Sequence, residues 1–333
     1  MTAFAVIQLK PGIGDTLWHL PFVRAIASAA PGGQVTFLSP PSSLARELLV
    51  AEPKITEVLY FAHGGNEITR GLNVLRLARL MRSRNFQRIY ILDRTTRPAV
   101  AAWLAGIPER IGIGLGAQRG WITNPGIDRA HFHAHPIGWL KQLILSEGLN
   151  LPSTEPDLPV PANALVDIDT RFGHLPRPWL VLGLGASHPE KDWPDEHWCA
   201  LLQGLAHACR ATVFMIGGPT WRARAKRIID DSAVDAVNAC DLPILQSAAL
   251  CQRADLFVGA DSGALNLAAA VGTKAYGLFG LTPALDYSRY IHVIRAGDDP
   301  VAQTSMREIA PRRVISLIAV ELESIHPRQP APH

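Results

Sequence analysis

The chain has little of what marks a metal-cluster, disulfide-bonded, membrane-spanning or nucleic-acid-binding protein. Its 333 residues include 4 cysteines, and none forms a C-x-x-C pair, which argues against a zinc site and a disulfide framework. No apolar run approaches the roughly 18 residues that a membrane-spanning helix requires. Lys and Arg number 32 against 29 Asp and Glu, a net charge of +3, so no strong basic field for nucleic acid exists. These absences favour a soluble, cytoplasmic protein that can still touch the inner face of a membrane.

The composition that remains is typical of a globular protein with large cores. Hydrophobic residues make up 48% of the chain and charged residues 18%, which excludes extensive disorder. The length allows two domains of ordinary size. Near the N-terminus, Phe4–Leu9 is apolar but too short and too poor in preceding basic residues for a signal peptide, so a strand is predicted there.

Short apolar runs alternate with segments of helical spacing along nearly the whole chain. In the first half the predicted strands are Phe4–Leu9, Gln34–Leu38, Glu57–Phe61 and Arg88–Leu92. In the second half, predicted strands at Trp179–Leu184, Thr212–Ile216, Asp255–Val258 and Ala275–Phe279 alternate with predicted helices at Asp195–Cys209, Trp221–Ile229, Ile244–Cys251, Ala264–Val271 and Pro311–Ser324. This alternation predicts βαβ units and parallel sheets covered on both faces.

A proline-rich stretch separates the two halves. Six prolines lie between Asn150 and Pro178, too many for one continuous helix or a central strand. The sequence therefore predicts an α/β protein of two doubly wound, Rossmann-like domains, 1–160 and 179–326, joined by a linker at 161–178 and followed by a flexible tail at 327–333. Ligands of such sheets bind at the carboxyl ends of the strands, and the cleft between the two domains is the natural site.

The loop after the first strand reads Lys10-Pro11-Gly12-Ile13-Gly14-Asp15, with a helix expected from about Thr16. Gly12 and Gly14 permit a tight turn and close approach to a ligand. A dinucleotide fingerprint requires a third glycine at position 17, where this chain has leucine. Asp15 is either a helix cap that accepts backbone N–H bonds or a general base kept ionised by the same groups, and it can be both.

Two loops in the second half have the features of anion sites. The first contains Gly185, Ser187 and Lys191 before a proline-started helix; the second, Asp261-Ser262-Gly263, joins a strand to a helix whose free N–H groups can face a phosphate. The alternatives are an ordinary loop with a solvated lysine, and a helix start capped by Asp or Ser. Together with Asp15 in the other domain, the two loops indicate a nucleotide-diphosphate donor.

Other chemistries have weaker support. The chain lacks the G-x-x-x-x-G-K-[ST] phosphate loop and the G-x-S-x-G nucleophile elbow. His131, His133 and His135 alternate along one segment, but no carboxylate or cysteine stands near them in sequence, so no metal site and no cofactor are predicted.

Four motifs, in order, resemble glycosyltransferase family 9, the lipopolysaccharide heptosyltransferases and their relatives. They are Gly12-Ile13-Gly14-Asp15-Thr16-Leu17 with Leu20-Pro21, then Lys191-x-Trp193-Pro194, Asp261-Ser262-Gly263-x-x-Asn266, and Phe279-Gly280-Leu281-Thr282-Pro283. The resemblance implies a GT-B fold and an inverting, metal-independent transfer from a nucleotide-diphospho-heptose or similar donor. It also implies Asp15 as base, Lys191 as a catalytic phosphate contact, and donor contacts at Asp261, Ser262 and Gly263.

The chain departs from the family pattern at two places. Asn266 stands where the family usually has histidine, and Gly217-Gly218-Pro219-Thr220-Trp221 lacks the acid expected for the donor ribose. Trp221 is interpreted as a platform for the donor base. The implied function is transfer of a heptose or similar sugar to a lipopolysaccharide core or other surface glycan, with peripheral contact to the inner membrane. The alternatives are a catalytically degenerate nucleotide- or glycan-binding member and another GT-B enzyme such as a sugar epimerase.

Overall fold

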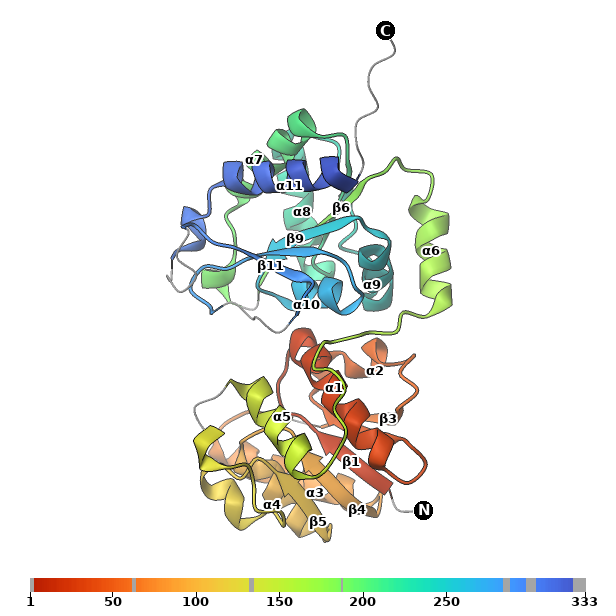
Figure 1. Cartoon of the computed structure of the whole chain (residues 1–333), viewed down its shortest axis with the longest axis vertical. Helices are drawn as coiled ribbons and strands as arrows, with labels where there is room; N and C mark the ends of the chain where they lie inside the picture. Colours follow the sequence, from red (N-terminus) through yellow and green to blue (C-terminus); the bar gives the residue numbers. More distant parts are fainter. Residues whose placement is uncertain are drawn as a thin grey trace. The chain divides into compact units, whose positions relative to one another are not determined.

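The computed structural model describes residues 3–61, 64–131, 135–186, 188–283, 288–297 and 304–325. The chain divides into two compact units, Met1–Asp157 and Leu158–His333. Each unit is a parallel sheet with helices on both faces (Figure 1). Within the described residues, no helix is both long and apolar enough to cross a bilayer.

The sheet of the first unit has five parallel strands in the order β3-β2-β1-β4-β5. The strands are β1 (Ala3–Ile7), β2 (Val35–Ser39), β3 (Ile55–Tyr60), β4 (Phe86–Ile91) and β5 (Glu109–Gly112). Helix α1 (Ile13–Ala29) lies with α5 (Pro136–Ser146) on one face, and α3 (Glu67–Arg82) lies with α4 (Thr96–Ala105) on the other (Figure 1); the short α2 (Ala45–Leu48) precedes β3. Since all strands run in parallel, the loops after β1, β3 and β4 meet at one edge.

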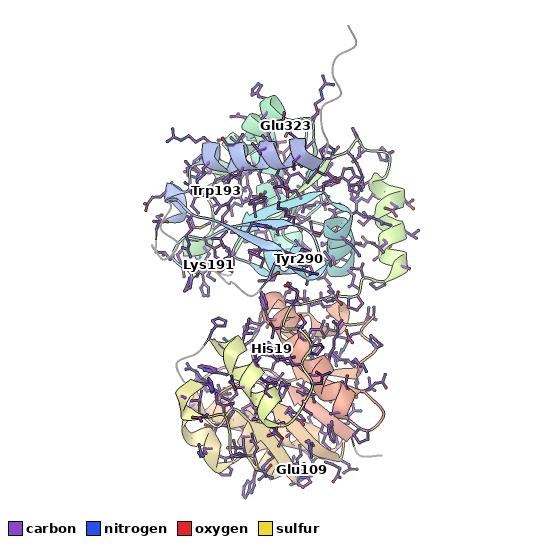
Figure 2. The ribbon with its side chains drawn as sticks, viewed as in Figure 1. His19, Glu109, Lys191, Trp193, Tyr290 and Glu323 are labelled. Carbon is purple, nitrogen blue, oxygen red and sulfur yellow. The ribbon has the colours of Figure 1, made fainter. Side chains whose placement is uncertain are left out.

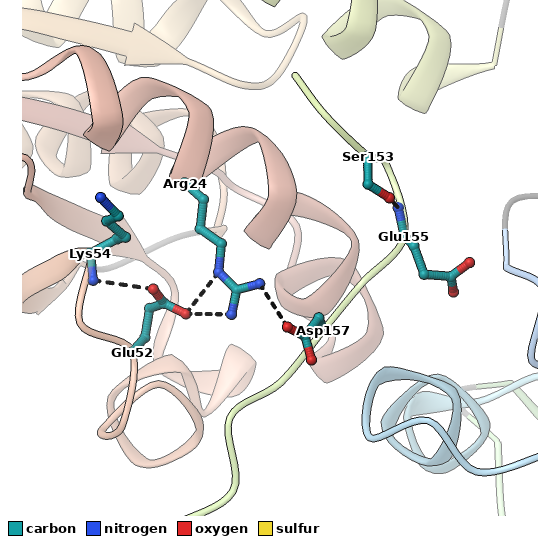
Figure 3. A network of polar contacts seen from close by, with 6 residues as sticks. All are labelled: Arg24, Glu52, Lys54, Ser153, Glu155 and Asp157. Carbon is teal, nitrogen blue, oxygen red and sulfur yellow. Dashed lines mark hydrogen bonds and ion pairs between the residues drawn. The ribbon is translucent and has the colours of Figure 1, made fainter. Parts of the chain in front are cut away.

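A network of charged side chains links Asp157, the last residue of this unit, to α1 (Figure 3). Two nitrogens of Arg24 donate to Oε2 of the buried Glu52, at 3.0 and 2.7 Å, and the third reaches Asp157 at 3.4 Å. The other oxygen of Glu52 accepts from the backbone N–H of Lys54 at 3.1 Å. Because the buried carboxylate has a partner at each oxygen, its burial is compensated and the segment that ends at Asp157 is held on this unit.

The sheet of the second unit has six parallel strands in the order β11-β10-β9-β6-β7-β8. The strands are β6 (Trp179–Gly183), β7 (Thr212–Ile216), β8 (Val237–Asn238), β9 (Leu256–Ala260), β10 (Ala275–Leu278) and β11 (Ile291–Ile294). Helices α7 (Asp195–Ala208), α8 (Arg222–Ser232) and α11 (Pro311–Ile325) pack together, and α9 (Ile244–Arg253) packs with α6 (Ala162–Phe172) and α10 (Gly263–Ala270). Strands β10, β9 and β6 are neighbours, so the loops that follow them lie side by side.

The two doubly wound sheets agree with the predicted α/β class, and two differences have local causes. Helix α6 forms inside the stretch interpreted as a linker, because Pro161 precedes its first residue and Pro176 and Pro178 follow its end. It packs on α9 and belongs to the second unit. Strands β5, β8 and β11 are not in the sequence prediction; they are four, two and four residues long, too short for a clear alternation pattern.

Candidate functional site

The loop after β6 is anchored by a tryptophan and presents a lysine. Trp193 is fully buried, donates its indole N–H to the carbonyl of Ile309 at 3.0 Å and packs edge-on against Trp198. Pro194 is the cap residue of α7. Lys191, two residues before the buried anchor, remains partly exposed (Figure 2). The Lys-x-Trp-Pro motif therefore fixes the loop through its tryptophan and holds the lysine at the carboxyl edge of the sheet.

Lys191 meets Asp261, the residue that follows β9. Its Nζ lies 2.7 Å from Asp261 Oδ2, and the two side chains are 21% and 15% exposed. The hydroxyl of Thr282, from the loop after β10, donates to the same oxygen at 3.0 Å. The structure thus brings together three of the four sequence motifs at the ends of β6, β9 and β10.

Helix α10 begins beside this network and carries an unsatisfied hydroxyl. Ser262 occupies the cap position with extended backbone, yet its side chain makes no capping bond. Its Oγ is buried and has no hydrogen-bond partner among the described residues. The first helical bond runs from the N–H of Asn266 to the carbonyl of Ser262, so the amides of Gly263 and Ala264 have no partner within the helix. This is an arrangement of uncharged donors suited to an anion.

Two of the predicted donor residues, Gly185 and Trp221, contact each other in the structure. Gly185 has φ +81°, and a Cβ there would lie 2.2 Å from the Trp221 ring, so both its backbone conformation and the close packing require glycine. The Arg224 guanidinium lies 5.1 Å from the centre of the Trp221 ring. Part of the ring surface is therefore already covered by protein. Its stacking on a base stays a prediction.

The remaining predicted donor residues differ in how well they are placed. Gly263 is the first residue of α10 and has no positive φ. Asn266 is 9% exposed, and its amide donates back to the carbonyl of Ser262 at 2.9 Å, so one of its N–H groups is used within the helix. Ser187 lies outside the described residues.

The structure adds two arginines that the motifs do not contain. Arg224 pairs with Asp192 and Asp195, both at 2.5 Å, and donates to the carbonyl of Trp193 at 3.0 Å. Burial raises the pKa of the Asp192 carboxyl, and this arginine opposes the shift. The buried Arg295 donates to the carbonyl of Thr282 at 3.1 Å. These arginines hold the Lys191 loop and the Thr282 loop, and no spacing in the sequence points to either, because their partners are distant in the chain.

In the first unit the β1–α1 loop differs from its predicted form. Helix α1 begins at Ile13 rather than near Thr16, and its cap residue is Gly12. The interpretation of Asp15 as the helix cap is therefore wrong: Asp15 is the third residue of the helix. Its carboxylate is partly exposed, and the structure records no hydrogen bond or ion pair for it within the described part of the chain.

The glycines of this loop provide space rather than an unusual turn. Gly12 has φ −88°, which any residue adopts, but a Cβ there would lie 2.8 Å from Asp15 Oδ2. Gly14 is buried in the first turn of α1 and has no positive φ. The absence of a side chain at position 12 thus lets the Asp15 carboxylate fold back over the helix start.

His19 anchors the same turn, as labelled in Figure 2. It is buried, with Nδ1 2.5 Å from the carbonyl oxygen of Asp15 and Nε2 3.4 Å from that of Leu92. The first contact holds the turn that carries Asp15, and the second joins α1 to the end of β4. No motif in the sequence points to His19, because both of its contacts are with backbone carbonyls.

A pocket opens at this edge of the first unit. It has a volume of about 310 Å³ including space open to solvent, and its lining includes Leu9, Phe61, Arg70, Asn73 and Arg97. Arg70 pairs with Glu67 at 3.2 Å, whereas no ion pair or hydrogen bond is recorded for Arg97 among the described residues. The pocket thus offers two guanidinium groups beside the β1–α1 loop, to which its lining residue Leu9 belongs.

Metal ligands are not gathered at either edge. Among the described residues, no group of three His, Cys, Asp or Glu side chains lies close enough to hold a metal ion. His133, the middle of the three alternating histidines, lies outside these residues. His135 caps α5, where its Nδ1 accepts from the N–H of Ile137 at 3.3 Å.

Comparison with known proteins identifies the family. The model of glycosyltransferase family 9 (heptosyltransferase) matches residues 74–295, more than half of the chain. Lipopolysaccharide heptosyltransferase 2 of Escherichia coli strain K12 is 23% identical over 335 residues, covering 91% of this chain and 94% of that protein.

Solved structures agree on the fold. The E. coli ADP-heptose lps heptosyltransferase II superposes with a TM-score of 0.75 at 21% identity, covering 97% of this chain and 99% of that one. The E. coli heptosyltransferase WaaC with ADP gives 0.69 at 18% identity, covering 97% and 100%. The fold is therefore the GT-B architecture of two Rossmann-like domains. The chain belongs to glycosyltransferase family 9.

Proposed function

We propose that this glycosyltransferase moves a sugar from a nucleoside-diphosphate donor held at the carboxyl edge of the second unit. The observation that carries the proposal is the meeting of Lys191, Asp261 and Thr282 beside a helix start whose Ser262 hydroxyl is buried without a partner. Such a helix start offers N–H groups and a positive dipole end to a diphosphate. The buried hydroxyl is satisfied once a phosphate oxygen accepts from it.

In the proposed reaction the first unit supplies the base. Asp15 takes the proton of an acceptor hydroxyl as its oxygen bonds to the anomeric carbon, and the bond from that carbon to the donor's β-phosphate oxygen breaks. Attack opposite the leaving group inverts the anomeric configuration. The nucleoside diphosphate leaves with one more negative charge, which Lys191 and the amides of Gly263 and Ala264 stabilise. These groups perform the role that a metal ion has in other transferases.

For the acceptor we propose a lipopolysaccharide core or another anionic surface glycan. The curated relative of E. coli is named for a lipopolysaccharide acceptor. In this chain the support is the pocket with Arg70 and Arg97, since guanidinium groups pair with carboxylates and phosphates of a sugar. The pocket and Asp15 share the same sheet edge, so a hydroxyl of a sugar bound there can approach the carboxylate.

For the donor we propose an ADP-activated heptose or similar sugar. The similar solved structures are an ADP-heptose lps heptosyltransferase and a heptosyltransferase with ADP. The loop after β7 has no acid for the ribose and presents Trp221 instead, so contact with the nucleoside depends on the ring. A catalytically silent member that binds nucleotide is the second candidate, favoured by Asn266 turning back on its own helix.

The test has two steps. A thermal-shift screen of nucleoside diphosphates selects the base, because a ligand at 100 times its dissociation constant adds about 2.7 kcal/mol of stability. Transfer from the matching nucleotide sugar is then measured on a lipopolysaccharide core acceptor. Product formation supports the enzyme; nucleotide binding without transfer or donor hydrolysis supports the silent alternative, and no nucleotide binding contradicts both.

A further inference from the structure

Helix α3 presents an apolar stripe that no described residue of its own unit covers. Ile68, Leu72 and Leu75 are 76%, 48% and 57% exposed. Their spacing of four and then three residues places them on one helix face. The fully buried residues of α3, namely Leu77, Ala78 and Met81, all lie in its C-terminal half. Residues 67–75 of the helix, which precede its first fully buried residue, thus turn three large apolar side chains to the outside.

The charges of α3 complement an anionic surface. The helix carries four arginines (Arg70, Arg76, Arg79 and Arg82) and one acid, Glu67. Arg76 and Arg79 are exposed. At 100° per residue, Arg76 lies beside the stripe, and Arg79 lies on the same face as the stripe, one turn after Leu75. Arg82 instead donates to the carbonyl of Leu104. An exposed apolar face with arginines beside it is the pattern of a helix that lies in the interface of an anionic bilayer.

Another exposed apolar stripe of the chain lacks this charge. Helix α11 exposes Leu317 and Val320, the latter by 68%. Its two arginines are balanced by two glutamates, so it offers no attraction to an anionic surface. The combination of apolar exposure with an excess of positive charge therefore distinguishes α3.

We infer that α3 docks the protein on the surface of an anionic membrane, with Ile68, Leu72 and Leu75 inserted between headgroups. The inference rests on the proposed function in one respect, namely that the acceptor is a glycan linked to a lipid. A protein docked through α3 would then meet the sugar of that acceptor beside the inserted helix. Arg70 and Asn73 of the same helix line the pocket. At 100° per residue they lie on the side of α3 opposite the stripe, so docking through α3 places the pocket about one helix diameter, roughly 10–12 Å, from the membrane surface. Insertion of side chains from one face is peripheral binding, not a membrane span.

The test is flotation with two kinds of vesicle: phosphatidylethanolamine with phosphatidylglycerol at a 3:1 ratio, and phosphatidylcholine alone. We expect the wild type to float with the anionic vesicles, less so at high salt, and the triple variant Ile68→Ser, Leu72→Ser, Leu75→Ser to lose partitioning by about tenfold or more. The matched control is Leu317→Ser with Val320→Ser, which removes exposed apolar groups from α11 and is expected to float like the wild type. Circular dichroism verifies that each variant is folded.

Several results would overturn the inference. One is a wild type that does not float with anionic vesicles; another is equal loss in the α3 and α11 variants. A third is a dimer, seen by light scattering, that the α3 substitutions dissociate without any vesicle binding, since the stripe would then join two copies. Vesicle binding requires no turnover, so failed transfer with intact flotation counts against the proposed function alone. The α3 variant should still bind nucleotide as the wild type does.

Discussion

Replacing Lys191 by methionine tests whether the lysine belongs to a diphosphate site. Methionine keeps an apolar stem of similar length and removes the charge. Asp261 retains the Thr282 hydroxyl at 3.0 Å and lies at the start of α10, where a negative charge is favourable. We therefore expect a folded variant that loses about 1–2 kcal/mol, between the values for exposed and buried ion pairs.

The expected effect of Lys191→Met on diphosphate binding is at least as large as its effect on stability. One unit charge about 4 Å from a phosphate at an effective dielectric constant near 20 contributes about 4 kcal/mol. Lys191 already pairs with Asp261, so part of this attraction is offset by the carboxylate. A net loss of about 2 kcal/mol corresponds to about a 30-fold weaker diphosphate complex.

Calorimetric titration with the selected nucleoside diphosphate and with its nucleoside separates the charge effect from general damage. We expect the diphosphate affinity of Lys191→Met to fall about 30-fold and the nucleoside affinity to stay unchanged. Lys226→Met is the matched control, because Lys226 also pairs with a carboxylate at 2.7 Å but lies exposed on α8. Asp261→Asn removes the competing negative charge, and its diphosphate affinity should rise. Two results would refute the reasoning. One is an equal loss of affinity for the diphosphate and the nucleoside in Lys191→Met. The other is a similar loss of diphosphate affinity in Lys191→Met and in the control Lys226→Met.

Four further outcomes are expected. Asp15→Asn should melt within a few degrees of the wild type, since the Asp15 carboxylate makes no hydrogen bond within the described residues, and lose at least about 10²-fold in turnover; a fully active variant would remove Asp15 as base. Gly12→Ala places a Cβ 2.8 Å from Asp15 Oδ2, so turnover should fall while nucleotide affinity, measured by titration, does not. Gly263→Ala should leave α10 intact, because Gly263 has no positive φ, but weaken the diphosphate more than the nucleoside. Transfer should continue in excess EDTA, and loss that Mg²⁺ restores would contradict a charge-neutralising Lys191.

The meeting of the motifs could be predicted from the sequence because parallel sheets obey a simple rule. Each motif follows an apolar strand, and the carboxyl ends of parallel strands share an edge. The rule predicts that Lys191, Asp261 and Thr282 lie at one edge of the sheet, but it does not predict the distances between their side chains. Where a proline marks the start of a helix, as at Pro194 before α7 and Pro311 in α11, the predicted helix starts also agree with the structure.

What the sequence could not provide are contacts between segments that no local pattern connects. Arg224 reaches carboxylates 32 and 29 residues earlier in the chain, and its position in α8 looks like an ordinary solvated arginine. The sequence predicts the start of α1 three residues too late, because Gly12 is a weak capping signal and Asp15 a strong one. The exposed face of α3 could not be predicted because a local pattern is present but misleading: leucines at helical spacing ordinarily predict burial.

The charges at the proposed donor site agree with a composition that shows no preference for an anion. Lys191 and Asp261 cancel each other, so the side chains at the centre of the site carry no net charge. Much of the attraction for a diphosphate is then expected from uncharged donors, which act beside Lys191: the amides at the start of α10, its dipole and the buried Ser262 hydroxyl. The fold holds these donors in place. Because they are uncharged, they do not contribute to the net charge of +3. Diphosphate binding at this site should accordingly depend less on salt than binding to a cluster of lysines would.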